Sequence, residues 1–173
     1  KTGNGAPAYS VSNTYNLGTP IANQPTADLP GQNNNPNLKP ETTTGIEVGV
    51  DLNAFNNRIR FGATYYNQTS KDLILPLQID AASGFTSSWE NAGEMNNKGF
   101  ELQLGLTVLK KTDFSFDIDM NFAKNQNEVV SLGLTDAYVL GGQWDMELQA
   151  RKGEAYGSIV GYPYLRNDAG QIV

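Results

Sequence analysis

The stretch that decides the fold spans residues 100–122, whose two halves read FELQLGLTV (100–108) and FSFDIDMNF (114–122). In each half every second residue is apolar, and the residues between are polar or glycine. A period of two places neighbouring side chains on opposite faces of a β-strand. The stretch therefore predicts two strands, each with one apolar and one polar face, joined by a short turn around residues 110–113.

Two further ladders of the same kind lie earlier in the chain. One covers residues 46–52 and the other residues 59–66, with about six residues around Phe55-Asn56 between them. The segment 68–97 and the chain from about residue 125 onward lack this alternation, and so do residues 1–40. Short, long and short connections are typical of hairpins in an antiparallel meander. We therefore expect an all-β fold with four strong strands.

Composition excludes several kinds of chemistry. The 173 residues contain no Cys and no His, which removes disulfides, thiol nucleophiles and imidazole bases. The net charge of −6 disfavours binding to nucleic acid. Two pairs of carboxylates, Glu90 with Glu94 and Asp117 with Asp119, lack the surrounding pattern of a glycosidase site. Asp80, Asp136 and Asp145 do not form a recognisable calcium-binding loop. We expect no enzyme activity, no metal site and no cofactor.

Two environments could explain the ladders. In a soluble sandwich the apolar face packs on a second sheet, whereas in a membrane barrel it faces lipid and the polar face lines a wet lumen. The two ladders of residues 100–122 run nine residues each, within the length of about nine to eleven residues that a tilted strand needs to cross a bilayer. Aromatic residues lie near the strand ends, where interfacial girdles occur. These features favour the barrel over the sandwich.

Four strands cannot close a barrel, because the smallest bacterial barrels have about eight. In lipid the chain would need neighbouring strands that it does not encode. The alternative is a self-contained soluble all-β carbohydrate-binding module or adhesin that oligomerises through its apolar sheet face. A clean monomer in plain buffer would favour this alternative.

Hairpin geometry also predicts a register. Pairing Leu52 with Ile59 would set Asp51 opposite Arg60 on the polar face. In the second hairpin, pairing Val108 with Phe114 would set Leu104 opposite Ile118, and Gln103 opposite Asp119.

The segments that connect the ladders carry a family resemblance. Residues 35–42, NPNLKPET, are similar to the NPxLKPE signature of TonB-dependent outer-membrane receptors, and residues 91–101, NAGEMNNKGFE, resemble the NAGExxNKGxE stretch of their SusC/RagA-like subfamily. Further motifs follow in the order typical of that subfamily: Phe55–Arg58, Tyr65–Asn67, Lys71–Ile74, Phe122–Asn125, Gly153–Gly157, Gly161–Tyr162 and Asp168–Gly170. The resemblance covers residues 10–173.

The resemblance implies a fold and a function that the periodicity alone does not. Its members have a 22-stranded transmembrane β-barrel with a plug, and they import oligosaccharides or peptides across the outer membrane of Gram-negative bacteria. They work with a SusD-like surface lipoprotein and the TonB system. The chain would then be a fragment of the C-terminal half of the barrel, since it lacks the plug and the TonB box.

The family topology divides the chain into three segments. Residues 1–42 would be an extracellular loop and strand lead-in, residues 43–124 four barrel strands in two hairpins, and residues 125–173 an extracellular loop region leading toward further strands. The short connections 53–58 and 110–113 would be periplasmic turns. The lumen-facing residues would be Glu47, Asp51, Arg60, Glu101, Gln103, Asp117, Asp119 and Asn121. Aromatic residues of the loops, which could stack on sugar rings, are Trp89, Trp144, Tyr156, Tyr162 and Tyr164.

Overall fold

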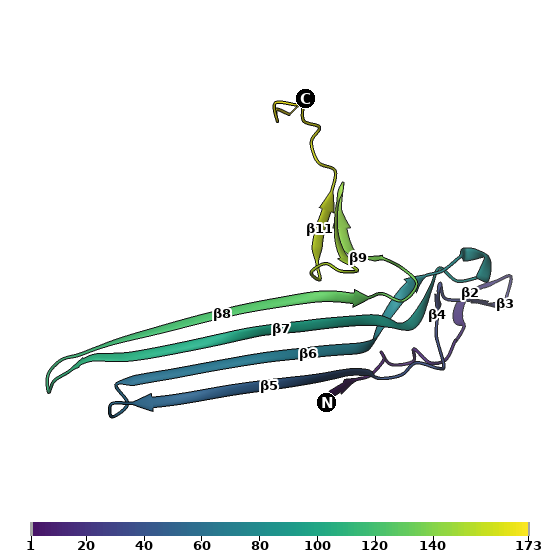
Figure 1. Cartoon of the computed structure of the whole chain (residues 1–173). Helices are drawn as coiled ribbons and strands as arrows, with labels where there is room; N and C mark the ends of the chain where they lie inside the picture. The colour runs from purple at the N-terminus through teal and green to yellow at the C-terminus, as the bar shows by residue number, and fades with distance from the viewer. Residues whose placement is uncertain (1, 173) are drawn as a thin grey trace.

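Four long antiparallel strands form an open sheet in the computed structural model, which describes residues 2–172. They are β5 (Glu41–Ala54), β6 (Ile59–Gln78), β7 (Ser87–Lys110) and β8 (Ser115–Ser131). Figure 1 shows them side by side, with tight turns at one end and the smaller elements gathered at the other. The expected meander is confirmed. Residues 1 and 173, the outer limits of the first and third expected segments, lie outside the described residues.

The smaller elements lie at the loop end of the sheet (Figure 1). Strand β1 (Thr2–Asn4) pairs with β5, and the two-residue β4 (Gln32–Asn33) runs parallel to the start of β7. The other strands form a hairpin and a three-stranded sheet, and one short 3-10 helix connects β6 to β7. Their bounds are β2 (Asn16–Ile21), β3 (Gln24–Asp28), η1 (Ala81–Ser83), β9 (Ala137–Gln143), β10 (Met146–Arg151) and β11 (Ser158–Gly161).

The strands are longer than the ladders that predicted them. Segment 68–97, expected to be a connecting loop, is mostly strand, and only residues 79–86 connect β6 to β7. Likewise β8 continues to Ser131, beyond the point where alternation ends. Backbone hydrogen bonds extend a ladder whatever the side chains are. Alternation reveals a strand only where its two faces meet different surroundings.

The predicted register of both hairpins is wrong by two residues. Leu52 lies opposite Phe61, Asp51 opposite Gly62, and Asn53 opposite Arg60. The cause is a tighter turn than expected, because Phe55, Asn56 and Asn57 all adopt positive φ (53°, 55° and 64°) and leave only four residues between the strands. A shift of two residues keeps every side chain on its predicted face.

The second hairpin shows the same kind of correction. Its turn closes early, with Lys111 N donating to Phe114 O at 2.8 Å. A bulge between Thr107 and Leu109 shifts the pairing. Consequently Gln103 lies opposite Asn121, not Asp119, and Leu104 lies opposite Met120, not Ile118.

Little of the chain is buried. Val129, Leu132 and Ala150 form one small cluster at the loop end, with Leu75, Tyr138 and Leu140 packed against it. Toward the turns, the apolar side chains of the four long strands are instead exposed or only half-buried, among the exposed ones Ile46 (71%), Val48 (64%) and Phe122 (54%). Among residues 2–172 no helix has the length and apolar character that crossing a membrane would require. The sheet is therefore not organised around a core of its own.

Candidate functional site

The eight residues predicted to face a lumen share one face of the sheet. Directly opposed residues of antiparallel strands point the same way, and the register aligns Asp51, Gly62, Gln103 and Asn121 in one row. The flanking rows bring in the rest: Glu47, Arg60, Glu101, Asp117 and Asp119. We call this surface the polar face, and the opposite surface the apolar face.

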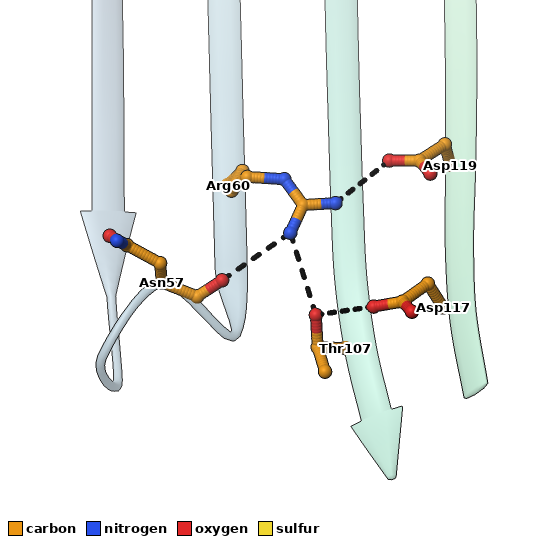
Figure 2. Close-up of polar contacts among 5 residues, drawn as sticks. All are labelled: Asn57, Arg60, Thr107, Asp117 and Asp119. Carbon is orange, nitrogen blue, oxygen red and sulfur yellow. Dashed lines mark hydrogen bonds and ion pairs between the residues drawn. The ribbon is translucent and has the colours of Figure 1, made fainter. Parts of the chain in front are cut away.

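A hydrogen-bonded network occupies the turn end of the polar face (Figure 2). Arg60 Nη2 donates to Asp119 Oδ1 at 3.0 Å, and Nη1 lies 3.4 Å from both Asn57 O and Thr107 Oγ1. Thr107 Oγ1 in turn donates to Asp117 Oδ1 at 2.6 Å. The predicted ion-pair partner of Arg60, Asp51, is replaced by Asp119, which lies two strands away. Both side chains of this pair are well exposed, so the pair contributes about 0.2–1 kcal/mol.

Gly105 makes that contact possible. It lies between Arg60 and Asp119 in the same row, so the arginine side chain crosses directly over it. A Cβ at this position would stand 2.6 Å from Arg60 Nη2 and 2.8 Å from Asp119 Oδ1. The glycine therefore keeps open the space that the guanidinium group occupies.

A second glycine is covered in the same manner nearer the loop end. The end of the Tyr66 ring lies over Gly99, where an added Cβ would be 2.6 Å from the tyrosine Oη. The hydroxyl reaches β8 and donates to Asn125 Oδ1 at 3.2 Å. Long side chains of β6 thus cross the glycines of β7 and connect to β8, which stiffens the sheet on its polar face.

The two sequence motifs that resemble the receptor family contact each other at the loop end. Lys39 N donates to Asn91 Oδ1 at 2.7 Å, and Asn91 Nδ2 donates back to Lys39 O at 2.8 Å. Asn35 Nδ2 donates to Trp89 O at 3.1 Å. Glu41 Oε1 accepts from the backbone N of Ile74, beside a bulge in β6. These hydrogen bonds attach residues 35–41 to strands β6 and β7, so the motifs have a structural role.

A cavity of about 860 Å³ lies beside this junction. Its walls come from β4, the end of β6, the start of β7 and residues 133–139. They mix apolar side chains such as Leu77 and Tyr138 with amides and one carboxylate, Glu90. Ser88 Oγ and Asn35 Nδ2 hold that carboxylate at 3.0 and 3.1 Å. The cavity can therefore offer hydrogen bonds and apolar contact together.

None of the five aromatic candidates lines this cavity. Trp89 is partly buried in β7, while Tyr156, Tyr162 and Tyr164 are exposed. Trp144 is 95% exposed at the turn between β9 and β10 and adopts a φ of 57°. The ring stacking recorded within residues 2–172 joins Phe100 to Phe122, so the structure does not bring the five together in stacked pairs.

The sequence did not predict two further residues of the site, Tyr138 in the cavity and Asn97 on the polar face. Tyr138 lines the cavity and packs on the small core, and only the fold could place it there. The amide oxygen of Asn97 is buried without a hydrogen-bond partner among the described residues. Asn97 continues the polar alternation of β7, a signal that would have extended the predicted set by one more row.

Two of the carboxylates on the polar face make structural contacts. Asp117 and Asp119 accept hydrogen bonds from Thr107 and Arg60. Within the described part of the chain no three acidic side chains gather into a group that could hold a metal ion. The arrangement is suited to binding and to lining a wet surface.

Comparisons with known proteins agree with this architecture. Residues 2–170 match the family described as TonB dependent receptor-like, beta-barrel. The chain is 34% identical over 135 residues to TonB-dependent receptor P3 of Formosa agariphila, an alignment covering 75% of this chain and 14% of that protein. It is 30% identical over 132 residues to TonB-dependent receptor SusC of Bacteroides thetaiotaomicron, covering 73% and 13%.

A solved structure has the same fold. The RagAB peptide transporter superposes with a TM-score of 0.75 at 25% identity, over 88% of this chain and 17% of the matched chain. The chain thus spans about one seventh of the length of the curated relatives it matches. The two-faced sheet and the family match together place it: the chain belongs to the TonB-dependent receptor β-barrel family.

Proposed function

We propose that the chain forms a section of barrel wall in an outer-membrane importer, with its loop end outside the cell and its turn end in the periplasm. The observation that carries this proposal is the two-faced sheet: toward the turns its apolar side chains are exposed or half-buried with no core of their own to cover them, and its other face carries Arg60, Asp117 and Asp119. The family to which the chain belongs is one of the outer membrane.

The height of the apolar face supports this placement. On β7 the apolar face extends from Phe100 to Leu109, which is about 30 Å along the strand at 3.4 Å per residue. A barrel strand tilted by about 40° would convert this length to roughly 23 Å, close to the apolar band of about 25 Å in outer-membrane barrels. Soluble strands average only about five to six residues, whereas β7 has 24.

The polar face would line the lumen and contact another part of the receptor. The lumen-facing residues of this proposal are the eight named above, joined by Asn97. Glu47, Asp51 and Glu101 on this face are exposed, and a segment inside the lumen would supply partners for their carboxylates. In a complete receptor we infer that this segment is the plug, which the TonB system moves during import.

The loop end would capture the ligand. The cavity beside Glu90 and the exposed rings of Trp144, Tyr162 and Tyr164 offer amides, one carboxylate and aromatic faces. These groups suit an oligosaccharide or a peptide, because both ligands combine many hydrogen-bonding groups with apolar surfaces. A SusD-like surface lipoprotein would cover this end. Import needs binding and movement, and the chain would perform no chemistry on its ligand.

Fractionation of the source cells tests the proposal. An antibody to residues 100–122 should detect an outer-membrane band that is far larger than 18.8 kDa and changes mobility on boiling, as folded barrels do. A soluble band near 18.8 kDa would contradict the proposal and support the soluble self-associating module instead.

Trp144 provides a sharper test of ligand capture. A left-handed backbone is costly for a bulky residue such as this tryptophan, whose φ is 57°. Replacing Trp144 by Gly relieves the backbone and removes the ring. We expect equal or slightly higher barrel stability but weaker binding of oligosaccharide or peptide, measured by calorimetry on the complete receptor. Unchanged binding would remove Trp144 from the ligand site. Leu17→Ala, a change of a comparably exposed side chain (88%) outside the cavity, serves as the control.

A further inference from the structure

Two lysines interrupt the apolar face where it ends toward the loops. On β7, Lys98 lies on the same side of the strand as Phe100 and Leu102. On β8, Lys124 lies on the same side as Phe122. No register shift occurs between Met95 and Thr107 of β7 or between their partners on β8. Both lysines therefore project from the apolar face and not from the polar one.

The register places the two lysines beside each other. Lys124 lies opposite Phe100, and Lys98 lies opposite Gln126 one row closer to the loops. Diagonal neighbours on adjacent strands are about 7–8 Å apart. Four-carbon side chains can bring two ammonium groups at this separation onto one anion. The next residues toward the turns are apolar, and Phe100 stacks on Phe122 with ring centroids 5.5 Å apart.

Neither lysine forms a salt bridge within the described chain. The salt bridges recorded there involve Arg60, Lys71 and Arg151, and both Lys98 and Lys124 are exposed. Glu128 projects from the same face one row beyond Lys98, where it lies opposite Asn96. The row of Lys98 also holds Asn67 and Gln126, whose amides can donate hydrogen bonds. Two cations, two amides and one carboxylate thus border an apolar, aromatic surface.

We propose that Lys98 and Lys124 bind the phosphate of a lipid headgroup, while the acyl chains of that lipid lie over Phe100 and Phe122. This inference rests on the proposed membrane placement, which puts both lysines at the boundary between hydrocarbon and headgroups. Lysine side chains at such a boundary extend their ammonium groups to the polar region and leave their stems in the apolar one. Each lysine near an anionic lipid surface contributes measurably to attraction.

The test uses the complete receptor, purified in detergent and titrated with lipid A while bound lipid is counted by native mass spectrometry. We expect the double variant Lys98→Gln/Lys124→Gln to bind lipid A about 25-fold more weakly than the wild type. The matched control is Lys110→Gln/Lys111→Gln, which removes the same charge at the turn end and should bind like the wild type. Dephosphorylated lipid A should bind the wild type weakly, with an affinity similar to that of lipid A for the Lys98→Gln/Lys124→Gln variant.

Each other outcome overturns a different statement. Equal binding by the wild type and the Lys98/Lys124 variant would overturn the site, as would an equal loss in both double variants. Displacement of lipid A by inorganic phosphate would indicate an ion site without lipid preference. A receptor that fails to insert in vesicles of phosphatidylcholine would refute the proposed function itself, whereas insertion with unaltered lipid binding would refute only this inference.

Discussion

Asn91 and Lys39 exchange two hydrogen bonds, one in each direction between the Asn91 amide and the Lys39 backbone, at 2.7 and 2.8 Å. The same amide nitrogen also donates to Asp72 O at 2.8 Å. One side chain thus joins residues 35–41, the bulge of β6 and the start of β7. This relationship explains why two motifs about fifty residues apart in the sequence act as one structural unit.

Removing this side chain should loosen the loop end. Asn91→Ala leaves the Lys39 N–H and two carbonyl groups without their partner, at a cost of about 1–3 kcal/mol. We expect faster protease cleavage within residues 30–40. We also expect unfolding at a lower urea concentration, monitored by the loss of heat modifiability. Asn37→Ala, which changes an exposed side chain in the same motif, should behave like the wild type. Equal cleavage of Asn91→Ala and the wild type would refute the role.

Two glycines form a matched pair for testing space on the sheet. Gly105→Ala would push the flexible Arg60 side chain off Asp119, and we expect a loss of about 0.2–1 kcal/mol, the contribution of that exposed ion pair. At Gly141 nothing lies within 4 Å of an added Cβ, so Gly141→Ala should be neutral or stabilise by up to about 1 kcal/mol. Urea titration of the refolded barrel measures both. Similar values for the two variants would show that the space over Gly105 is unimportant.

Tyr66 should stabilise the sheet mainly by covering Gly99. Tyr66→Phe keeps the ring and loses only the bond to Asn125, which costs about 0.5–1.5 kcal/mol. Tyr66→Ala also uncovers the glycine and should lose more, because aromatic side chains rescue strand glycines by packing across them. The order of urea midpoints, wild type above Phe above Ala, is the expected result. A Phe variant as unstable as the Ala variant would assign the effect to the hydroxyl group instead.

Arginine substitutions at neighbouring residues on opposite faces of the sheet test which face contacts lipid and which contacts water. Leu104→Arg and Ile118→Arg would each place a charge near the middle of the apolar face, and each should destabilise the inserted barrel by about 2–4 kcal/mol. Gln103→Arg introduces the same charge one residue away on the polar face and should be tolerated. The yield of heat-modifiable barrel in the outer membrane gives the comparison. Normal assembly of both apolar-face variants would exclude lipid contact at those positions.

The amino-acid sequence by itself determined the four strands, the division into two faces and the family. Alternation at Ile46, Phe61, Leu104 and Met120 is a local property, because a strand exposes successive side chains to opposite surroundings. A register error of two residues left those faces intact, since the side-chain period is also two.

Only the tertiary structure decided which residues meet. The left-handed run at Phe55–Asn57 set the register, and Arg60 therefore reaches Asp119 across Gly105 and does not pair with Asp51. The sequence also did not predict the parts of β6, β7 and β8 that continue beyond the alternating ladders toward the loops. Backbone hydrogen bonds hold these parts as strands, and their side chains show no regular alternation of apolar and polar residues. The cavity with Tyr138 joins segments far apart in sequence, and such long-range contacts depend on how the strands are aligned rather than on any local pattern.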